Sequence, residues 1–175
     1  MTREEYKQAA NYWVEKDVSA VKMEQEELKT YVEASILTHN TCALATGYGD
    51  FVRCTPIEYT YREGAFWIFS EGGTKFIPLE HNPNVCLAIF DPYGGFNGLL
   101  GLQVTGVAEM IEPFSEEYLE AAKVKNLSEA AMRKFSKPMN LIKITPTVID
   151  CISSEVKKRG FSPRQRLILR EKDEA

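Results

Sequence analysis

The hydrophobic and polar positions near the start of the chain predict two helices. In the first, apolar side chains recur at helical spacing and form one face: Tyr6, Ala9, Ala10, Trp13 and Val14. Thr2 and Glu5 have the spacing of a capping box, which marks the start of this helix. The second helix is expected over about residues 24–35, with an apolar side made of Leu28, Tyr31, Val32 and Ile36. Both helices are interpreted as packing elements, and Trp13 is expected in the core or at a dimer contact.

From residue 41 the pattern changes to short β-type runs separated by turn residues. Six strands are expected, over residues 41–46, 51–61, 65–69, 84–90, 99–111 and 139–152. The first three follow one another through short glycine-containing turns, as in an antiparallel meander. Gly101 and Gly106 would permit bends or bulges in the fifth strand, as the corners of a barrel require. The pattern therefore predicts a mainly β protein with peripheral helices, built on a small closed or partly open barrel.

Three further helices are expected outside these strands. A short one over residues 74–81 ends at Asn82-Pro83. Residues 115–124 and 128–135 form a helical insertion, and each of its helices opens with a serine N-cap. The charged stretch over residues 157–175 is interpreted as a surface segment with a frayed end. Its basic side chains are expected to be solvated, with cofactor covering or the binding of an anionic substrate as the alternative.

Length and composition fit a single globular domain. The 175 residues are 44% hydrophobic and 26% charged, which argues against disorder. We expect one domain over residues 1–175, with N-terminal helices at about 3–36 and the helical insertion at about 115–136. The formal net charge of −4 makes a general attraction to nucleic acid or anionic lipid unexpected. Because the sequence shows neither a signal peptide nor an apolar run of roughly 18–20 residues, we expect a cytoplasmic protein that does not cross a membrane.

The cysteines and histidines do not predict a metal centre. The chain has four cysteines: Cys42, Cys54, Cys86 and Cys151. They form no C-x-x-C pair and lie in or beside apolar runs, so they are interpreted as small buried hydrophobic residues in a reducing compartment. With only His39 and His81 besides, no zinc cluster is expected. His39 is interpreted as a structural, hydrogen-bonded histidine, with heme ligation as the alternative.

One stretch has the residue types of a monophosphate site. Ser70-Glu71-Gly72-Gly73-Thr74-Lys75 links a strand to a helix, and its glycines let the backbone approach a ligand closely. Thr74 is expected at the helix N-cap, where free N–H groups favour an anion, and Lys75 adds a positive charge. Arg53, on the neighbouring strand, would make a forked contact with the same phosphate. The alternative is a glycine turn with a capped helix and two surface charges, because short Gly-Gly-Thr-Lys segments are common. The segment matches neither a P-loop nor a dinucleotide fingerprint.

Five segments of the chain, taken in order, are similar to a known family: His39–Thr46, Arg53–Ile57, Phe66–Ser70 with Thr74-Lys75, His81–Ala88 and Leu102–Glu109. Together they resemble the pyridoxamine 5′-phosphate oxidase-like, FMN-binding split-barrel family over about residues 33–152. The resemblance implies a six-stranded antiparallel split β-barrel. It also implies a homodimer with two flavins at the subunit interface.

The resemblance further implies roles for individual residues. Thr74 and Lys75 would hold the FMN phosphate, and Arg53 would reach the phosphate or the ribityl chain. Ser70 and Glu71 would lie near the ribityl chain or the ring. Four consecutive residues would place their backbone along the isoalloxazine edge: Arg53, Cys54, Thr55 and Pro56.

Two features concern the second subunit and the substrate. Gln103 would make a flavin contact from the second subunit. The namesake enzyme of the family has a C-terminal tryptophan followed by an R-x-H-x-R run. Arg159-Gly160-Phe161 and Arg164-Gln165-Arg166 do not match this signature, so we do not expect the chain to be that enzyme itself.

These observations predict an FMN-binding flavoprotein that acts as an oxidoreductase. It would pass electrons or hydride from a reduced donor to a small acceptor, and the flavin would carry the redox chemistry. No single residue is an evident catalyst. Two alternatives stay open: a heme-binding or heme-handling protein that uses His39, and a non-catalytic flavin-binding module. A deazaflavin in place of FMN is compatible with the same phosphate clamp.

Overall fold

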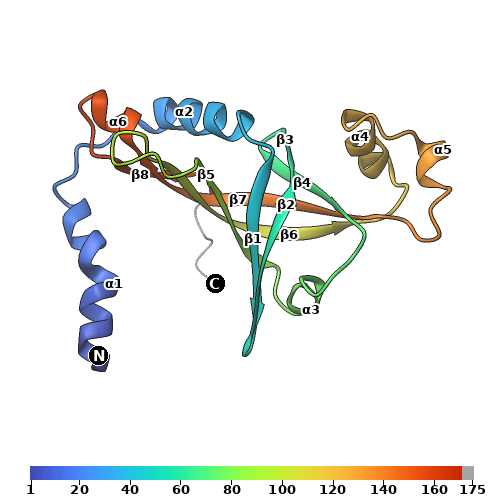
Figure 1. Ribbon diagram of the computed structural model, residues 1–175, viewed down its shortest axis with the longest axis horizontal. Coiled ribbons are helices and arrows are strands. Elements are labelled where there is room, and N and C mark those ends of the chain that lie inside the picture. The colour runs from blue at the N-terminus through green and yellow to red at the C-terminus, as the bar shows by residue number, and fades with distance from the viewer. Residues whose placement is uncertain (171–175) are drawn as a thin grey trace.

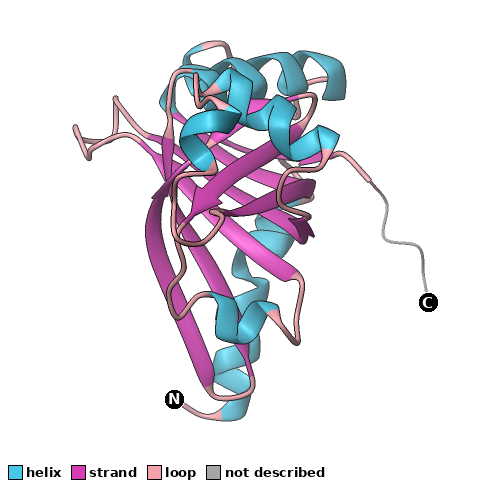
Figure 2. Cartoon of the chain, turned by 90° about the vertical axis from the view of Figure 1, so that its right-hand side faces the viewer, coloured by secondary structure: helices cyan, strands magenta, loops and turns pink. Residues whose placement is uncertain are grey.

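One curled antiparallel sheet dominates the computed structural model, which describes residues 1–170 (Figure 1). Eight strands form it: β1 (Thr41–Tyr48), β2 (Phe51–Glu58), β3 (Thr60–Arg62), β4 (Ala65–Ser70), β5 (Asn84–Phe90), β6 (Leu100–Ile111), β7 (Asn140–Ser153) and β8 (Arg164–Ile168). Their order is β2-β1-β5-β6-β7-β4-β3, with β8 paired to β7. The sheet curls without closing, because β2 and β3 end the order unpaired with each other (Figure 2). The predicted antiparallel split barrel is therefore confirmed.

The number of strands differs from the six that were expected. The expected strand over residues 51–61 is divided at Tyr59 into β2, which pairs with β1, and β3, which pairs with β4. The charged C-terminal stretch contains β8, so its interpretation as a frayed surface segment is wrong for residues 164–168. There Gln165 and Leu167 are buried while the alternate residues are exposed, the two-residue period of a strand. Residues 171–175 lie outside the described part of the chain.

Six helices accompany the sheet within the described residues: α1 (Arg3–Asp17), α2 (Gln25–Leu37), α3 (Phe76–Leu79), α4 (Glu116–Val124), α5 (Glu129–Met132) and α6 (Ser154–Lys158). The predicted N-caps of α1, α4 and α5 are confirmed, at Thr2, Ser115 and Ser128. Figure 1 shows α2 lying along one face of the sheet, α1 extending away from it, and α4 with α5 at the opposite end. None of the helices in residues 1–170 is long and apolar enough to cross a membrane.

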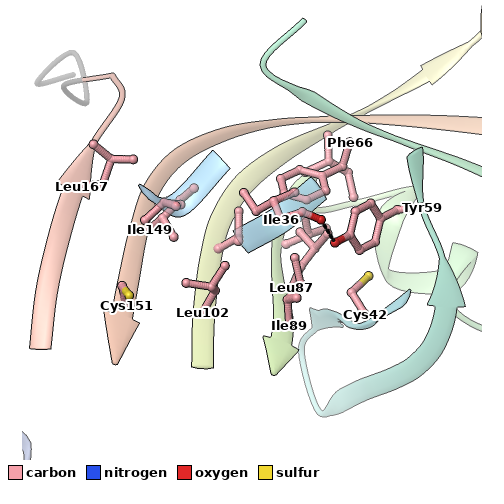
Figure 3. Packing of buried hydrophobic residues seen from close by; sticks show 14 of the residues in the cluster. Ile36, Cys42, Tyr59, Phe66, Leu87, Ile89, Leu102, Ile149, Cys151 and Leu167 are labelled. Atoms are coloured by element: carbon pink, nitrogen blue, oxygen red, sulfur yellow. Dashed lines mark hydrogen bonds between the residues drawn. The ribbon is translucent and has the colours of Figure 1, made fainter. Parts of the chain in front are cut away.

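The main core lies between α2 and the inner face of the sheet. Leu28, Val32 and Ile36 of α2 are fully buried against side chains from the strands. Figure 3 shows Ile36 and Tyr59 within this cluster, where the Tyr59 hydroxyl donates to Ile36 O at 2.7 Å. A second cluster packs Trp67 of β4 under α4 and α5. The first helix contributes to neither cluster.

Helix α1 has no buried residue, although its apolar face was predicted from the same spacing rule. Trp13 is 49% exposed, so its expected place in the core is wrong, whereas its role at a dimer contact stays a prediction. The physical reason is that α1 projects from the sheet instead of lying on it (Figure 1). An apolar stripe predicts that a helix has a packing face, but the surface that covers the face is decided by the tertiary structure.

The side of the sheet opposite α2 consists largely of small residues. Cross-strand partners share a face, and the register places one row on this side: Pro56, Ala43, Ala88, Gln103, Asp150 and Arg166. The neighbouring row contains Cys54, Ala45, Cys86 and Thr105. We call these two rows the outer face. Their residues are exposed or half-exposed, so within residues 1–170 the sheet is covered by α2 on one side and is largely uncovered on the other.

Candidate functional site

Strand β2 carries four of the predicted flavin-contacting residues. It is an end strand of the sheet, pairs only with β1 within residues 1–170, and lies against β4 across the split. Arg53 is the cross-strand partner of Thr46 and Thr55 that of Leu44, so both face the inner side, whereas Cys54 and Pro56 belong to the outer face. The second edge of β2 leaves backbone N–H and C=O groups without a strand partner. Such an edge can bind the rim of a planar heterocycle.

The loop that connects β4 to α3 is tied into a fixed shape. The buried Ser70 hydroxyl accepts from the Gly72 N–H at 3.3 Å and lies 3.2 Å from Gly72 O. Asn140 Nδ2 donates to Ser70 O at 3.1 Å, which joins the loop to β7. Gly73 has a φ of +113°, and a Cβ atom there would lie 3.4 Å from Lys75 Nζ. Glycine at position 73 therefore serves both the turn and the space around the lysine, while Glu71 is exposed beside it.

Lys75 is the most unusual residue of this loop. Its side chain is buried, with 5% of the residue exposed, and its Nζ donates to Gly72 O. The ammonium also lies 4.9 Å from the centre of the Phe76 ring. Within residues 1–170 Lys75 forms no ion pair with a carboxylate. Burial lowers the pKa of Lys75, as expected for a cation that has lost water without gaining an anion.

The expected helix N-cap is wrong. Helix α3 has four residues and begins at Phe76. Its N-cap is Lys75, whose side chain does not cap the helix, and Thr74 lies in the preceding turn. The expected helical range of 74–81 is reduced because the chain leaves the helix after Leu79. A single turn has little macrodipole, so an anion at this corner would depend on the buried charge of Lys75 and not on a helix terminus.

A buried hydroxyl near Arg53 was not singled out in the sequence. Thr46 is 2% exposed, lies opposite Arg53 on β1, and its Oγ1 has no hydrogen-bond partner among residues 1–170. The segment after α3 is bonded to the same end of β1, because Asn82 Nδ2 donates to Gly47 O at 2.8 Å. An unpartnered buried hydroxyl is uncommon and fits a site that receives a polar ligand. The signal in the sequence was a threonine at an inward-facing position of an otherwise apolar strand.

The structure does not bring Gln103 to this loop. Gln103 lies on β6, separated from β2 by β1 and β5, and belongs to the outer face. There it lines a cleft of about 470 Å³ together with residues of α1 and β8. Within one chain, Gln103 and Lys75 therefore belong to different sites, and a shared role would require a second copy.

The histidine and the thiols have distinct environments. His39 Nδ1 lies 2.8 Å from Ser35 O and its Nε2 lies 2.9 Å from Asp91 Oδ1, so both ring nitrogens are engaged. Cys42 and Cys151 are buried, and burial raises the pKa of each thiol to about 12. Cys54 is exposed, so its interpretation as a buried residue is wrong, because nothing in residues 1–170 covers β2 from outside. No group of three side chains suited to a metal ion occurs in this part of the chain.

Comparison with known proteins agrees with this architecture. The family model described as pyridoxamine 5′-phosphate oxidase matches residues 25–151. No curated protein matches the chain. A putative pyridoxamine 5′-phosphate oxidase from Listeria innocua has a TM-score of 0.56 and 23% identity, over 71% of this chain and 97% of that chain.

Two further solved structures have the same fold. An FAD-binding protein from Mesorhizobium loti has a TM-score of 0.56 and 18% identity, over 69% of this chain and 89% of that chain. HutZ, described as a heme storage protein from Vibrio cholerae, has a TM-score of 0.56 and 16% identity, over 71% of this chain and 91% of that chain. The fold therefore occurs in proteins described with different cofactors.

Proposed function

The chain belongs to the pyridoxamine 5′-phosphate oxidase family, and from this premise we propose that it is a flavoprotein that binds FMN without a covalent bond. In this proposal it acts as an oxidoreductase that passes electrons or hydride from a reduced donor to a small acceptor. When bound, FMN supplies the redox chemistry, and the protein supplies binding, orientation and control of solvent access.

The observation that carries the proposal is the buried ammonium of Lys75 in the glycine loop. A buried charge without a counter-charge is costly, so such a charge is usually paired with an anion. The FMN phosphate is a dianion with oxygen acceptors suited to Lys75 Nζ and to nearby backbone N–H groups. Its arrival would give Lys75 the partner that the described residues do not provide.

Neighbouring groups would complete the site. Arg53 would offer a forked contact to the phosphate, and the Thr46 hydroxyl would gain a hydrogen-bond partner. The free edge of β2 would offer N–H and C=O groups to the isoalloxazine rim, except at Pro56, which has no N–H. Ser70 would act by holding the loop through its two hydrogen bonds to Gly72.

We further propose that the protein is a homodimer that pairs through the outer face. The small residues of this face, such as Ala45 and Ala88, would let a second subunit approach the sheet closely. Gln103 lies on this face and away from the Lys75 loop of its own chain. It would then contact the flavin held by the partner.

Heme has less support than FMN as the bound cofactor. His39 was the candidate ligand, but both of its nitrogens are engaged, with Ser35 O and Asp91 Oδ1. Ligation of heme iron by His39 would require the loss of at least one of these interactions. This argument concerns His39, and the visible spectrum of the purified protein decides between the two cofactors.

The first experiment titrates apoprotein with FMN and with riboflavin, which lacks the phosphate. We expect FMN to bind more tightly, and Lys75→Gln to weaken FMN binding by roughly 10- to 100-fold while riboflavin affinity stays the same. Lys158→Gln is the matched control, because Lys158 is exposed and pairs with Glu155. Equal loss of both ligands, or no loss of either, would contradict the phosphate assignment.

The second experiment examines the protein as purified. Flavin bands near roughly 375 and 450 nm are expected, whereas a band near roughly 400 nm would indicate heme and contradict the proposal. Mass spectrometry of the released ligand distinguishes FMN from a deazaflavin. Oxidation of a reduced nicotinamide by the loaded protein tests the oxidoreductase role. Tight FMN binding without turnover would instead identify a non-catalytic flavin-binding module.

A further inference from the structure

The two ends of the chain form a unit outside the family-matched range of residues 25–151. The linker after α1 is bonded to the C-terminal segment: the Val21 N–H donates to Ser162 Oγ at 2.9 Å, and the Ser162 N–H donates to Val21 O at 2.9 Å. The Met23 N–H donates to Gln165 Oε1 at 3.0 Å. These bonds fix the linker beside β8, and the C-terminal end of α1 leads into this linker.

A cleft of about 580 Å³ lies between α1 and this C-terminal segment, and we call it the terminal cleft. Its apolar lining comes from Trp13, Ala20, Phe96, Leu99, Ile152 and Pro163. Arg164 holds its guanidinium carbon 4.0 Å from the centre of the Trp13 ring, which connects α1 to β8 across the cleft. The cleft is therefore large enough for a small aromatic molecule, and its walls are apolar.

Hydrogen bonds hold the floor of the terminal cleft in place. The Ser154 hydroxyl donates to Phe96 O at 2.8 Å and accepts from the Leu99 N–H at 2.9 Å. Ser153 Oγ lies 2.6 Å from the Tyr31 hydroxyl. The loop that carries Phe96 is thus fixed to the start of α6, so the cleft is a built feature of the fold.

The charged groups around the terminal cleft are mostly positive. Lys16, Lys157 and Arg164 line it, and within residues 1–170 they form no ion pair with a carboxylate. The one acidic lining residue, Asp17, is paired with Lys22. The whole chain has a formal net charge of −4, whereas the side chains that line the terminal cleft have a net positive charge.

We propose that the terminal cleft binds a small aromatic carboxylate, independently of the flavin site. The ring would pack against Phe96 and the exposed part of Trp13, and the carboxylate would accept from Arg164 with Lys157 nearby. Apolar walls and cationic rims complement this class of ligand in both shape and charge. The Lys75 loop of the same chain contributes no residue to the lining, so the ligand would not occupy the phosphate clamp, although Trp13 and Arg164 also line the neighbouring cleft that contains Gln103.

The test titrates 2-naphthoate into the full-length protein by calorimetry, with 2-naphthamide as the neutral analogue. We expect naphthoate to bind at least tenfold more tightly than naphthamide. The double variant Arg164→Gln/Lys157→Gln should remove this preference, and Trp13→Ala should weaken both ligands. Lys158→Gln is the matched control, because Lys158 belongs to the same helix, does not line the cleft and should leave the preference unchanged.

Three outcomes would overturn the proposal. Equal affinity for naphthoate and naphthamide would show that the cations do not select an anion. Competition between naphthoate and FMN would place the probe in the flavin site. If naphthoate does not bind and Trp13→Ala converts a dimer to a monomer in sedimentation velocity, a second copy of the chain occupies the cleft. Because the naphthoate titration requires no flavin, its result is independent of whether FMN binds.

Discussion

The two faces of the sheet are built by the same strands but have opposite environments. Leu44, Leu87 and Val104 point to the inner face and are fully buried under α2. Their chain neighbours Ala45 and Thr105 point outward and are half-exposed or exposed. Successive side chains in a strand alternate between faces, so a shift of one residue along the chain separates the core from the surface.

The difference between the two faces shows that the inward-facing and outward-facing positions of a strand have to be interpreted separately. On the inner face, large apolar residues predict a core, and the chain covers them with its own helix α2. On the outer face, the alternate positions are occupied by small residues such as Ala43, Ala45 and Ala88, and less often by charged ones. Small residues allow close approach by another surface, and this is the basis for placing the second subunit there.

The largest effect is expected on the inner face. Leu87→Ala would leave a cavity beside fully buried neighbours and should lower the free energy of unfolding by about 2–5 kcal/mol. Ala88→Ser, one position along on the outer face, should change it by less than about 0.5 kcal/mol at a protein concentration at which the subunits are separate. Urea denaturation of both variants measures the contrast. Similar losses for the two would mean that the faces are not as different as the structure indicates.

The next effect concerns the assembly. Ala45→Arg places a long charged side chain in the middle of the outer face and should weaken the proposed dimer at least tenfold, about 1.4 kcal/mol, with little effect on the fold of each subunit. Sedimentation equilibrium over a range of concentrations measures this. A wild-type protein that sediments as a monomer, or a variant that dimerises normally, would exclude the outer face as the interface.

The reactivity of the cysteine thiols tests the difference between the two faces of the sheet without a substitution in the core. At pH 8 the inner-face thiols Cys42 and Cys151, with pKa values raised to about 12, contain about one thiolate in 10,000. Cys54 is exposed on the outer face of the single chain and should react with iodoacetamide at least about 100-fold faster in the Ala45→Arg variant, in which no second subunit covers this face. Peptide mass spectrometry of time points measures the rates. Protection of Cys54 by FMN would support the assignment of β2, and equal labelling of all thiols would contradict the burial pattern.

The smallest expected effect is a pH dependence of the free energy of unfolding, which originates from Lys75. Because burial lowers its pKa below the usual 10.5, the unfolded chain binds more protons than the folded chain between the two pKa values. The free energy of unfolding should therefore rise with pH in that alkaline range, and Lys75→Gln should remove the rise. Saturation with FMN should also reduce it, since a bound phosphate raises the pKa of its lysine. Denaturation midpoints for wild type and variant against pH measure the difference.

Much of the fold was predictable because local patterns agree with the tertiary structure. The spacing of Leu28, Val32 and Ile36 predicted the buried face of α2, and serine N-caps predicted the starts of α4 and α5. The same reasoning failed for Trp13, because helical spacing does not identify what the helix packs on. Strand β8 was missed because two of its three exposed positions are arginines, and their charge obscured the alternating buried Gln165 and Leu167.

The residue types of the candidate site could be predicted from the sequence, but the burial and arrangement of their side chains could not. Lys75 was identified from its charge beside two glycines, but its burial depends on Phe76 and on the fixed loop, which no local pattern shows. The helix N-cap predicted at Thr74 was wrong because α3 begins at Phe76, which makes Lys75 the N-cap residue. Thr46 was missed because only the sheet register places it opposite Arg53.

The pairing of β4 with β7, which sets Phe66 against Ile144, has a consequence for how the chain acquires its structure. The bond between Met23 and Gln165 joins positions 142 residues apart. Such distant partners must meet before their contacts can offset the entropy of closing a long loop, which slows folding. During synthesis, β1 to β6 would leave the ribosome before β7 is available to join them. The inner surface of the sheet is therefore expected to stay incompletely paired until β7 has been synthesised and joins β4 and β6.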